Sequence, residues 1–480
     1  MLLSFAFVLT PRYSAIAILP TPNSVSDSNA FVYYQFTFEA KCDWSAFYSP
    51  GHEIQEHLQG VVDKYKLMRN IKLSHEVLEE FEDIADVPLT AFGAITRWKL
   101  SDIPGIADYK GELHHTADYQ PSGRTWKSDL EKWKDKRVGV VGSGSTATQV
   151  VSALAPHVTS LANYVRGQTW LVSPFSLAMV QDLLGRPSAA IEDDLRLQPE
   201  EIERFKSDLE YFDRVRHTLE NSMNRESTMQ AEFQKMFRKL MEEKLAARPH
   251  IAAKLIPGFP VDFVSSPIKT FTATGIETED GQRKDLDLVF CATSYDTSWQ
   301  LPFKIVGCNG VDLNEKWKPF PTSYLSVCVD GFPNRFMSLG PNSVIGAGVL
   351  LPILEFAVAY AVQATVKMQR ERLKSMEVKL RAVQDFDKYI ETLFNRAKYF
   401  PQSVYSAKCR SWYKLGKEEG RIIGLWPGSN LHAIKALQYP RWEDYDYERT
   451  DPEENSLYWL GDGQTVWNEK NADTGDRVGI

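Results

Sequence analysis

A glycine-rich turn between an apolar segment and a helix-like segment constrains this sequence more than any other feature. The segment Arg137–Val141 holds three valines, which is typical of a short buried strand. The turn that follows, Gly142–Ala147, has the pattern G-x-G-x-x-A, and Thr148–Leu154 continues with helical character. A strand before the glycines and a helix after them is the context that a dinucleotide-binding turn requires.

Each small residue of this turn has a specific expected role in holding a dinucleotide. Gly142 permits the tight turn, and Gly144 lets backbone N–H groups approach a diphosphate at the helix N-terminus. Ala147 keeps the helix close to the strand. The expected cofactor contacts in this region are Gly142, Ser143, Gly144, Ser145, Thr146, Ala147 and Gln149. The alternative is an ordinary connection between a strand and a helix that binds nothing.

The next expected strand, Ser160–Arg166, favours NADP(H) over NAD(H). An NAD site usually places Asp or Glu about 20 residues after the glycines, whereas an NADP site places Arg near the 2′-phosphate. No carboxylate occurs between Val150 and Val180, and the strand ends in Val165 and Arg166. We therefore expect Val165 and Arg166 to contact NADP(H). The alternative is that Arg166 is a solvated charge at a strand end.

Composition excludes several other classes of protein. The chain has 480 residues, too many for one ordinary core, so two or three domains are expected. A net charge of −8, without any block of Lys and Arg, argues against a nucleic-acid partner. The five cysteines are not closely paired, which predicts neither a disulfide framework nor a zinc site. Reduced cysteines in the cytoplasm are the expected state.

Two apolar runs bear on whether the chain contacts a membrane. The run Met1–Thr10 lacks the positive region of a signal peptide and is too short to span a bilayer. We expect a buried strand or a misread gene start there, with a cryptic signal as the alternative. The run Ala347–Val366 is interrupted by Pro352 and Glu355, so a buried helix is expected. No membrane partner is predicted.

Apolar periodicity predicts further elements along the chain. A helix is expected from about Asp43 to Met68. A charged helical region, roughly Pro199 to Leu245, has one apolar face formed by Ile202, Phe205, Leu209 and Phe212. The remaining expected elements are strands over Asp262–Ser265 and Thr270–Glu277, a turn at Gly281, a buried strand over Asp287–Thr293 and a long helix from about Leu351.

Several motifs, in order along the chain, resemble the class B flavin monooxygenases, and among them the Baeyer–Villiger type. The family signature F-x-G-x-x-x-H-x-x-x-W is similar to Tyr109–Tyr119, where Gly111 and His115 are kept and both aromatic ends are Tyr. Ala292–Asp296 resembles the family's A-T-G-F-D, with Ser in place of Gly. The other matching segments are Asp102–Gly105, Gly340–Ser343, Trp412-Tyr413 and Leu425–Ser429, the last three being most similar to fungal members.

The resemblance implies an α/β protein with two dinucleotide-binding, Rossmann-like domains. An NADP-binding domain with a helical insertion would cover residues 126–290 and interrupt an FAD-binding domain. The FAD-binding domain would be discontinuous and truncated, with a partial first piece at 1–125. The remainder, at 291–480, would also carry the C-terminal substrate-site region.

The resemblance also implies FAD, NADPH and molecular oxygen, with conversion of a ketone into an ester or lactone. In such enzymes the cofactor carries the redox step, and the protein positions the reactants and excludes water. The catalytic residues that it implies are Asp27 and His115. Asp27 falls on the family's flavin-side Asp, although an Asp in an Asn/Ser-rich turn has an ordinary explanation.

The remaining implied contacts lie near the flavin or in a hinge. Tyr33 or Tyr34 falls on the family's flavin-contacting Tyr, and Trp412 is placed among the cofactor contacts. Gly111 and His115 would belong to the hinge that couples cofactor binding to domain movement, with no role for His115 in proton transfer. The alternative for His115 is a packed or capping histidine.

Three departures separate the chain from the family pattern. The family begins with another G-x-G-x-x-G that binds FAD, followed by G-G-T-W, and neither is present. The family's extra strands are missing where Glu79–Asp83 runs into Ala85–Val87. The active-site Arg, which stabilises a developing anion by roughly a few kcal/mol, has no counterpart near Gly258–Val261, and Arg248 and Lys254 do not match its motif.

Two explanations compete for these departures: coding segments missing from the translated sequence, or a degenerate relative. Each loss lies at a junction between well-matched motifs, which favours missing segments. The main hypothesis is therefore NADPH- and FAD-dependent insertion of oxygen next to a ketone in fungal polyketide secondary metabolism, for example a mycotoxin pathway of the aflatoxin or sterigmatocystin type. The alternatives are flavin-dependent hydroxylation of carbon, nitrogen or sulfur, and a catalytically inactive NADP-binding relative.

Overall fold

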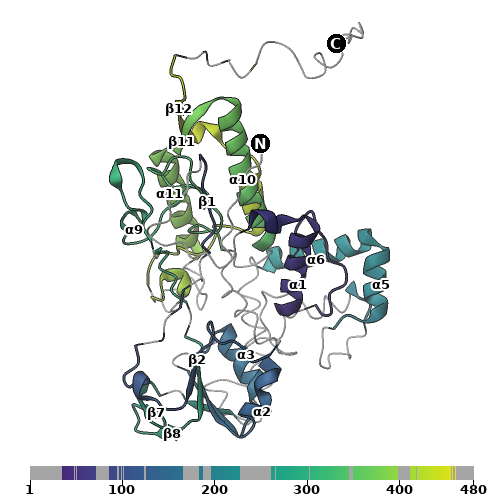
Figure 1. Ribbon diagram of the computed structural model, residues 1–480, viewed down its shortest axis with the longest axis vertical. Coiled ribbons are helices and arrows are strands. Elements are labelled where there is room, and N and C mark those ends of the chain that lie inside the picture. The colour runs from purple at the N-terminus through teal and green to yellow at the C-terminus, as the bar shows by residue number, and fades with distance from the viewer. Residues whose placement is uncertain are drawn as a thin grey trace.

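A computed structural model gives the arrangement of the chain in three groups of elements (Figure 1). A lower lobe is marked by the labels β2, α2 and α3, an upper lobe by α10 and α11, and a helical group by α1, α5 and α6. The described residues are 35–47, 49, 51–71, 86–93, 97–98, 100, 102–123, 126–165, 183–186, 196–226, 261–264, 266–293, 295–301, 303–344, 350–397, 411–417, 419–453, 455, 457 and 460.

The lower lobe is built on a five-stranded sheet with the order β2-β9-β3-β4-β5. Its strands are β2 (Glu112–His115), β9 (Leu288–Cys291), β3 (Arg137–Val141), β4 (Ser160–Tyr164) and β5 (Val261–Val264). All neighbouring strands run parallel, so their carboxyl ends meet at one edge. The chain leaves β3 toward β4 on one side and returns to β9 on the other. Such a switch point is where open α/β sheets bind their ligands.

Helix α3 (Ser145–Leu154) packs on this sheet because its apolar residues lie on one face. Ala147, Val150, Val151 and Leu154 follow the spacing i, i+3, i+4, i+7 and share a buried cluster with residues of β3, β4 and β9. The predicted strand at 137–141 and the helix after the glycines are confirmed, and the helix begins three residues earlier than expected. Helix α2 (Leu130–Trp133) contributes the fully buried Trp133 to the same cluster.

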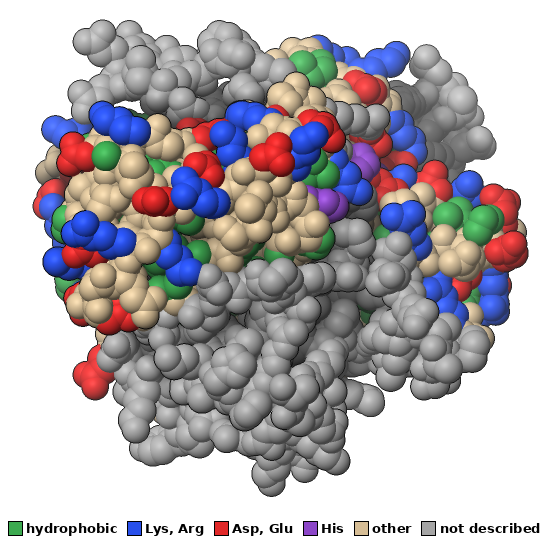
Figure 2. Space-filling view, turned by 90° about the horizontal axis from the view of Figure 1, so that it is seen from below, with side chains coloured by type: hydrophobic (Ala, Val, Ile, Leu, Met, Phe, Trp, Pro, Cys, Tyr) green, Lys and Arg blue, Asp and Glu red, His purple; other side chains and the backbone are tan. Residues whose placement is uncertain are grey.

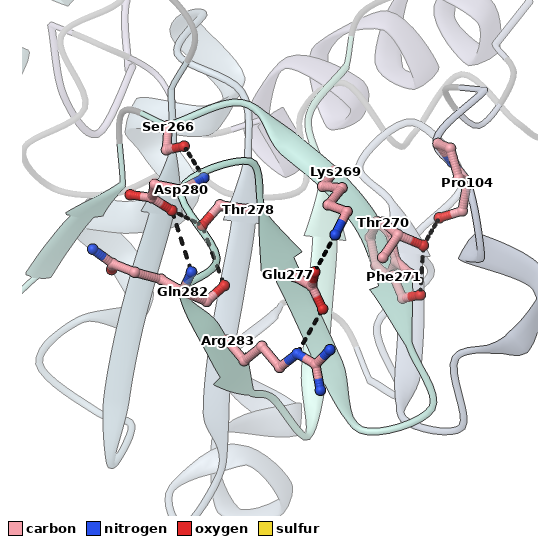
Figure 3. A network of polar contacts seen from close by, with 10 residues as sticks. All are labelled: Pro104, Ser266, Lys269, Thr270, Phe271, Glu277, Thr278, Asp280, Gln282 and Arg283. Atoms are coloured by element: carbon pink, nitrogen blue, oxygen red, sulfur yellow. Dashed lines mark hydrogen bonds and ion pairs between the residues drawn. The ribbon is translucent and has the colours of Figure 1, made fainter.

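A small antiparallel sheet, order β6-β7-β8, extends the lower lobe (Figure 3). It comprises β6 (Ile268–Thr272), β7 (Gly275–Thr278) and β8 (Arg283–Asp285). The prediction of one strand over Thr270–Glu277 is wrong, because the chain reverses after Thr272. Gly275 lets β8 approach β7 closely, since a Cβ there would lie 1.9 Å from the carbonyl oxygen of Lys284. The predicted turn at Gly281 is confirmed by its φ of 80°.

Polar contacts hold this small sheet together and tie it to the loop around Pro104 (Figure 3). The buried carboxylate of Glu277 accepts hydrogen bonds from Lys269 Nζ at 2.7 Å and Arg283 Nε at 2.5 Å. These two cations hold the pKa of Glu277 below its usual value. The carbonyl oxygen of Pro104 accepts from the Phe271 N–H at 2.8 Å. The loop that precedes β2 is therefore fixed against β6.

The helical group contains α1 (Gly51–Lys64), α5 (Pro199–Ser207) and α6 (Leu209–Glu226). The helix expected from about Asp43 begins only at Gly51, because the preceding segment pairs with the chain at Arg196 and Leu197. Phe205 and Phe212 are buried as predicted, but Leu209 is 59% exposed. The prediction for Leu209 is wrong because the helix breaks at Asp208, whose φ of −130° separates α5 from α6.

The upper lobe holds two pairs of strands and most of the remaining helices. Parallel strands β1 (Leu89–Thr90) and β10 (Phe336–Met337) form one pair, and antiparallel β11 (Leu373–Val378) and β12 (Tyr445–Arg449) form the other. The α-helices are α9 (Leu313–Lys316), α10 (Leu350–Arg370), α11 (Leu380–Ala397) and α12 (Asn430–Gln438). Short 3₁₀ helices across the whole chain are η3 (Leu67–Asn70), η4 (Ile106–Asp108), η5 (Trp126–Asp129), η6 (Cys308–Gly310), η7 (Trp412–Lys414) and η8 (Trp442–Asp444).

Helix α10 forms the centre of the upper core. Its residues Ile353, Ala357, Tyr360 and Ala364 are buried in a cluster shared with α11, α12 and β11. By length and composition, α10 is also the one helix in the described part of the chain that could span a membrane. Its packing between other elements of the lobe confirms the predicted buried helix.

The sheet around β3 draws strands from both sides of the predicted domain boundaries. β2 lies within residues 1–125, and β9 crosses the predicted boundary at 290. The division at 126 and 290 therefore stays a prediction.

Seen from below, basic and acidic side chains are interspersed over the described surface (Figure 2).

Candidate functional site

The turn after β3 lies at the carboxyl edge of the five-stranded sheet, at its switch point. Gly142 has a φ of 131°, a conformation that favours glycine. A Cβ at this position would also lie 2.4 Å from the carbonyl oxygen of Ala292, which follows β9. The Gly142 N–H donates to the carbonyl oxygen of Tyr164 at 3.0 Å. The close approach of two neighbouring strands therefore explains why this position is a glycine.

The N-terminus of α3 is arranged to receive an anion. Gly144 is its N-cap residue, and no side chain caps the helix there. The first turn of α3 contains no acidic residue, and a Cβ at Gly144 would find no atom within 4 Å. The first N–H groups of a helix have no partner within the helix and carry partial positive charge. Open space and uncapped donors together fit the diphosphate of a dinucleotide.

The other predicted contacts of this turn are of two kinds: residues on its open side, and residues buried against the sheet. Ser143 is half-buried and Thr146 is exposed, so both border the open side of the turn. Ala147 is buried against the sheet, as the pattern predicts. Gln149 is half-buried on α3, and Val165 is buried with its N–H donating to Val264 O at 2.9 Å. Ser145 begins α3.

His115 ends β2 at the same edge of the sheet. Its ring stacks on Trp98, with centroids 4.6 Å apart and planes 10° apart. Its Nδ1 accepts a hydrogen bond from the Ala117 N–H at 3.2 Å, which leaves the proton of a neutral ring on Nε2. The side chain is buried, with 3% of the residue exposed. This environment suits an orienting histidine better than one that exchanges protons with solvent.

The position of the Tyr109 side chain explains why residue 111 is a glycine. A Cβ at Gly111 would lie 2.2 Å from the Tyr109 hydroxyl oxygen. That hydroxyl donates to Leu286 O at 2.9 Å, and burial raises the pKa of Tyr109 to about 12. At the other end of the motif, the Tyr119 hydroxyl donates to the buried Asp129. The two aromatic positions of the signature are thus packed and hydrogen-bonded even though both are Tyr.

Two chain segments run side by side between the lobes and contact two predicted site residues, His115 and Trp412. The backbone at Arg97 pairs with that at Asp296, and Arg97 Nη2 lies 2.8 Å from Asp296 Oδ2. Tyr295 meets the His115 ring edge-on at 6.4 Å. Just beyond, the Thr297 hydroxyl donates to Trp412 O at 3.3 Å. The structure therefore brings His115, the segment from 292 and Trp412 to one connection between the lobes.

Two residues at this edge were missed by the motif analysis. Trp98, which stacks on His115, belongs to no recognisable pattern in the sequence. Asn163 is a polar residue within β4, between Ala162 and Tyr164, and its amide contacts the glycine turn. A polar residue interrupting an apolar strand was the available signal for Asn163.

The chain is similar in sequence to known proteins along most of its length. The FAD-binding monooxygenase tazF of Aspergillus terreus is 30% identical over 489 residues, covering 92% of this chain and 83% of the relative. The FAD-binding monooxygenase stcW of Emericella nidulans is 28% identical, covering 95% of this chain and 79% of the relative. A Baeyer–Villiger monooxygenase of Pseudomonas aeruginosa is 24% identical, covering 85% and 79%. No protein-family model matches the sequence.

The chain belongs to the FAD-binding monooxygenases. The predicted family is thereby confirmed over most of the chain. Among solved structures, cyclohexanone monooxygenase from Rhodococcus sp. Phi1 bound to NADP⁺ matches this monooxygenase with a TM-score of 0.70 and 22% identity. The match covers 93% of this chain and 99% of that one. It confirms the predicted α/β fold.

The described residues of this monooxygenase fit one dinucleotide, because the open turn at 142–147 and the uncapped α3 match a diphosphate. They contain no second G-x-G-x-x-G turn between a strand and a helix. No group of His, Cys, Asp and Glu that could hold a metal occurs among them. Asp27, Tyr33, Tyr34 and Arg166 lie outside the described residues. The same holds for Arg248 and Lys254, so the missing active-site Arg stays a departure of the sequence.

Proposed function

We propose that this protein is an NADPH- and FAD-dependent monooxygenase that inserts oxygen next to a ketone. The observation that carries the proposal is its 30% identity to an FAD-binding monooxygenase along 92% of the chain. The flavin, when bound, supplies the redox chemistry, and the chain supplies binding, orientation and exclusion of water. Fungal polyketide metabolism as the source of the ketone, molecular oxygen as co-substrate and the cytoplasm as the location belong to the same proposal.

The open turn at 142–147 supports NADPH as the reductant. Its backbone donors face open space at the N-terminus of α3, where a diphosphate is stabilised by uncapped N–H groups. We assign the 2′-phosphate to Arg166, which comes two residues after the end of β4 in the sequence. The flavin contacts are assigned to Asp27, with Tyr33 or Tyr34, and to Trp412.

His115 is proposed as a hinge residue. Its ring is held between Trp98 and the Ala117 N–H, close to the two segments that connect the lobes. A buried ring in such a place can transmit a shift of one segment to the other without exchanging a proton. The proposed domains are 126–290 for NADP and 1–125 with 291–480 for FAD.

Flavin content and cofactor preference test the proposal. We expect a purified protein with a visible flavin band, NADPH oxidation stimulated by a ketone, and a product heavier by one oxygen atom. Arg166→Ala should lower the preference for NADPH over NADH by about 10- to 100-fold, since a charge-assisted hydrogen bond contributes about 1.5–3 kcal/mol. Arg283→Ala on β8, a charge-matched change remote from the turn, should leave the preference unchanged.

Three results would contradict this function. A colourless protein that binds NADPH would indicate an inactive NADP-binding relative. Oxygen added to an amine, a sulfide or an arene, with no reaction on ketones, would indicate a flavin hydroxylase. An unaltered preference between NADPH and NADH in Arg166→Ala would remove the assignment of the 2′-phosphate.

A further inference from the structure

The side-chain amide of Asn163 bridges two carbonyl groups at the start of the glycine turn. Its Nδ2 donates to Val140 O at 3.0 Å and to Gly142 O at 2.9 Å. Val140 lies opposite Asn163 in the pairing of β3 with β4, and Gly142 is the first residue after β3. One amide group therefore spans the point where the strand ends and the turn begins.

Asn163 reaches the turn from the face of the sheet that α3 covers. Side chains alternate along a strand, so Asn163 shares a face with Leu161. Leu161 packs in the cluster that includes Val150 and Leu154 of α3. Asn163 itself is half-buried, two residues further toward the carboxyl edge. Its amide thus supports the turn from beside the N-terminus of α3 and leaves the open side of the turn free.

The Gly142 peptide is consequently held from both neighbouring strands. From β4, the Tyr164 carbonyl accepts from the Gly142 N–H while Asn163 donates to the Gly142 carbonyl. On the β9 side, a Cβ on Gly142 would lie 2.4 Å from the carbonyl oxygen of Ala292, so the neighbouring chain closely limits the position of Gly142. A glycine turn without such contacts has many accessible conformations, and ordering it on binding costs free energy.

We propose that Asn163 is a positioning residue that holds the 142–147 turn in its diphosphate-binding conformation and so sets the affinity for NADP(H). The inference rests on the proposed function of that turn. Asn163 acts through Gly142, and preorganisation of the turn in the free protein is what strengthens binding.

The amide is the chemical group that this position requires. Both atoms that it contacts are carbonyl oxygens, which only accept hydrogen bonds. Leucine has nearly the same shape but no donor, and an ionised aspartate has only acceptors. Aspartate would therefore repel both carbonyl oxygens and place a negative charge beside the diphosphate.

The test compares Asn163→Leu and Asn163→Asp with wild type and with Asn314→Leu. The control residue Asn314 lies in α9 of the upper lobe, and it also holds a loop through hydrogen bonds with Leu301 and Phe303. Calorimetric titration with NADP⁺ gives the Kd, and hydrogen exchange of the free protein reports on the turn. The KM and kcat for NADPH oxidation and the urea unfolding midpoint complete the comparison.

We expect Asn163→Leu to raise the Kd for NADP⁺ about tenfold, the loss that one or two such hydrogen bonds correspond to. Asn163→Asp should raise it further. In both variants amides of the 142–147 turn should exchange faster, and the KM for NADPH should rise while kcat stays within about twofold, as for loss of uniform binding. Asn314→Leu should lower the unfolding midpoint and leave the Kd unchanged.

The outcomes separate this inference from the proposed function. If wild type binds NADP⁺ and both Asn163 variants bind it equally well, the positioning role is wrong. If the Kd rises in step with a lower unfolding midpoint, and Asn314→Leu does the same, Asn163 is only structural and the inference fails. If wild type binds no NADP⁺ although the turn exchanges faster in the variants, the brace is real and the proposed function is wrong.

Discussion

The turn after β3 and the turn after β10 both contain a glycine, but their backbones face different surroundings. Gly144 in the first turn is exposed, and a Cβ there would meet nothing within 4 Å. Gly340 in the second is buried, and a Cβ there would lie 2.3 Å from Ser326 O. The first turn is open to a ligand, whereas the second is filled by the protein itself.

An asparagine amide braces each turn, and its position decides which turn stays open. Asn342 lies within the second turn, with a φ of 62°, and its Nδ2 donates to Ile422 O and Leu425 O, both at 3.0 Å. Asn163 lies on the strand next to the first turn and donates to two carbonyls from outside. In the open turn the hydrogen-bonding amide therefore comes from a neighbouring strand, whereas in the filled turn it comes from the turn itself.

Substituting the two glycines of the open turn should give the largest and most contrasting effects. Gly142→Ala forces a Cβ against the Ala292 carbonyl at a φ that favours glycine, so we expect about 3–4 kcal/mol of destabilisation. Gly144→Ala meets no protein atom at a φ of −74°, so stability should change by less than about 0.5 kcal/mol. Urea unfolding measures both changes.

Binding of NADP⁺ separates the roles of the two glycines further. The added methyl group in Gly144→Ala enters the space where a diphosphate would approach the backbone, so the Kd should rise about tenfold or more without a loss of stability. A Gly144→Ala protein that binds NADP⁺ as wild type does would contradict the assignment of this turn to the diphosphate.

Asn342→Ala should have the next largest effect, and on stability alone. The change removes two buried hydrogen bonds and leaves alanine at a left-handed φ, which together cost about 2–3 kcal/mol. The urea midpoint should fall while the Kd for NADP⁺ in the folded protein stays the same. A changed Kd with an unchanged midpoint would mean that the two turns are not independent.

The open turn was predictable because every part of it is encoded locally. The valines of β3, the glycines at 142 and 144 and the apolar spacing of α3 follow one another in the sequence. The hairpin between β6 and β7 was not predicted, because the Thr, Phe and Ile residues of Thr270–Glu277 favour a strand and the glycine at 275 was not taken as a sign of an interruption. Leu209 was assigned to an apolar face because its spacing fits one helix. The local signal of the break, Asp208, whose carboxylate accepts from the Tyr211 N–H at the start of α6, was overlooked.

The candidate site shows the same division between local and distant information. The family motifs predicted that Gly111 and His115 belong together, and the structure places them at the two ends of one short segment containing β2. The stacking of Trp98 on His115 joins residues from different segments, and sequence spacing carries no record of it. The Asn163 brace depends on the register of β3 against β4, which becomes visible only in the folded sheet.

The smallest expected effect concerns the amino end of the sheet, opposite the ligand edge. Asp287 accepts hydrogen bonds from the Arg137 guanidinium, with Nη2 at 2.8 Å and Nε at 3.0 Å, and from the Arg137 N–H at 2.9 Å. These bonds lower the pKa of Asp287 to about 2. Because the pKa is depressed in the folded state, this stabilisation is present above the unfolded value of about 4 and is lost as the pH falls toward 2.

Asp287→Asn should therefore destabilise the protein at neutral pH by only about 1 kcal/mol, since the pair is partly exposed and screened. Wild type should lose this increment between about pH 4 and pH 2, and the variant should lack that part of the pH dependence. Urea unfolding at several pH values measures the difference. The Kd for NADP⁺ should not change, because Asp287 lies at the opposite end of β3 from the open turn. If Asp287→Asn raised the Kd as Asn163→Leu does, the conformation of the turn would depend on the whole sheet, and not on the hydrogen bonds of Asn163.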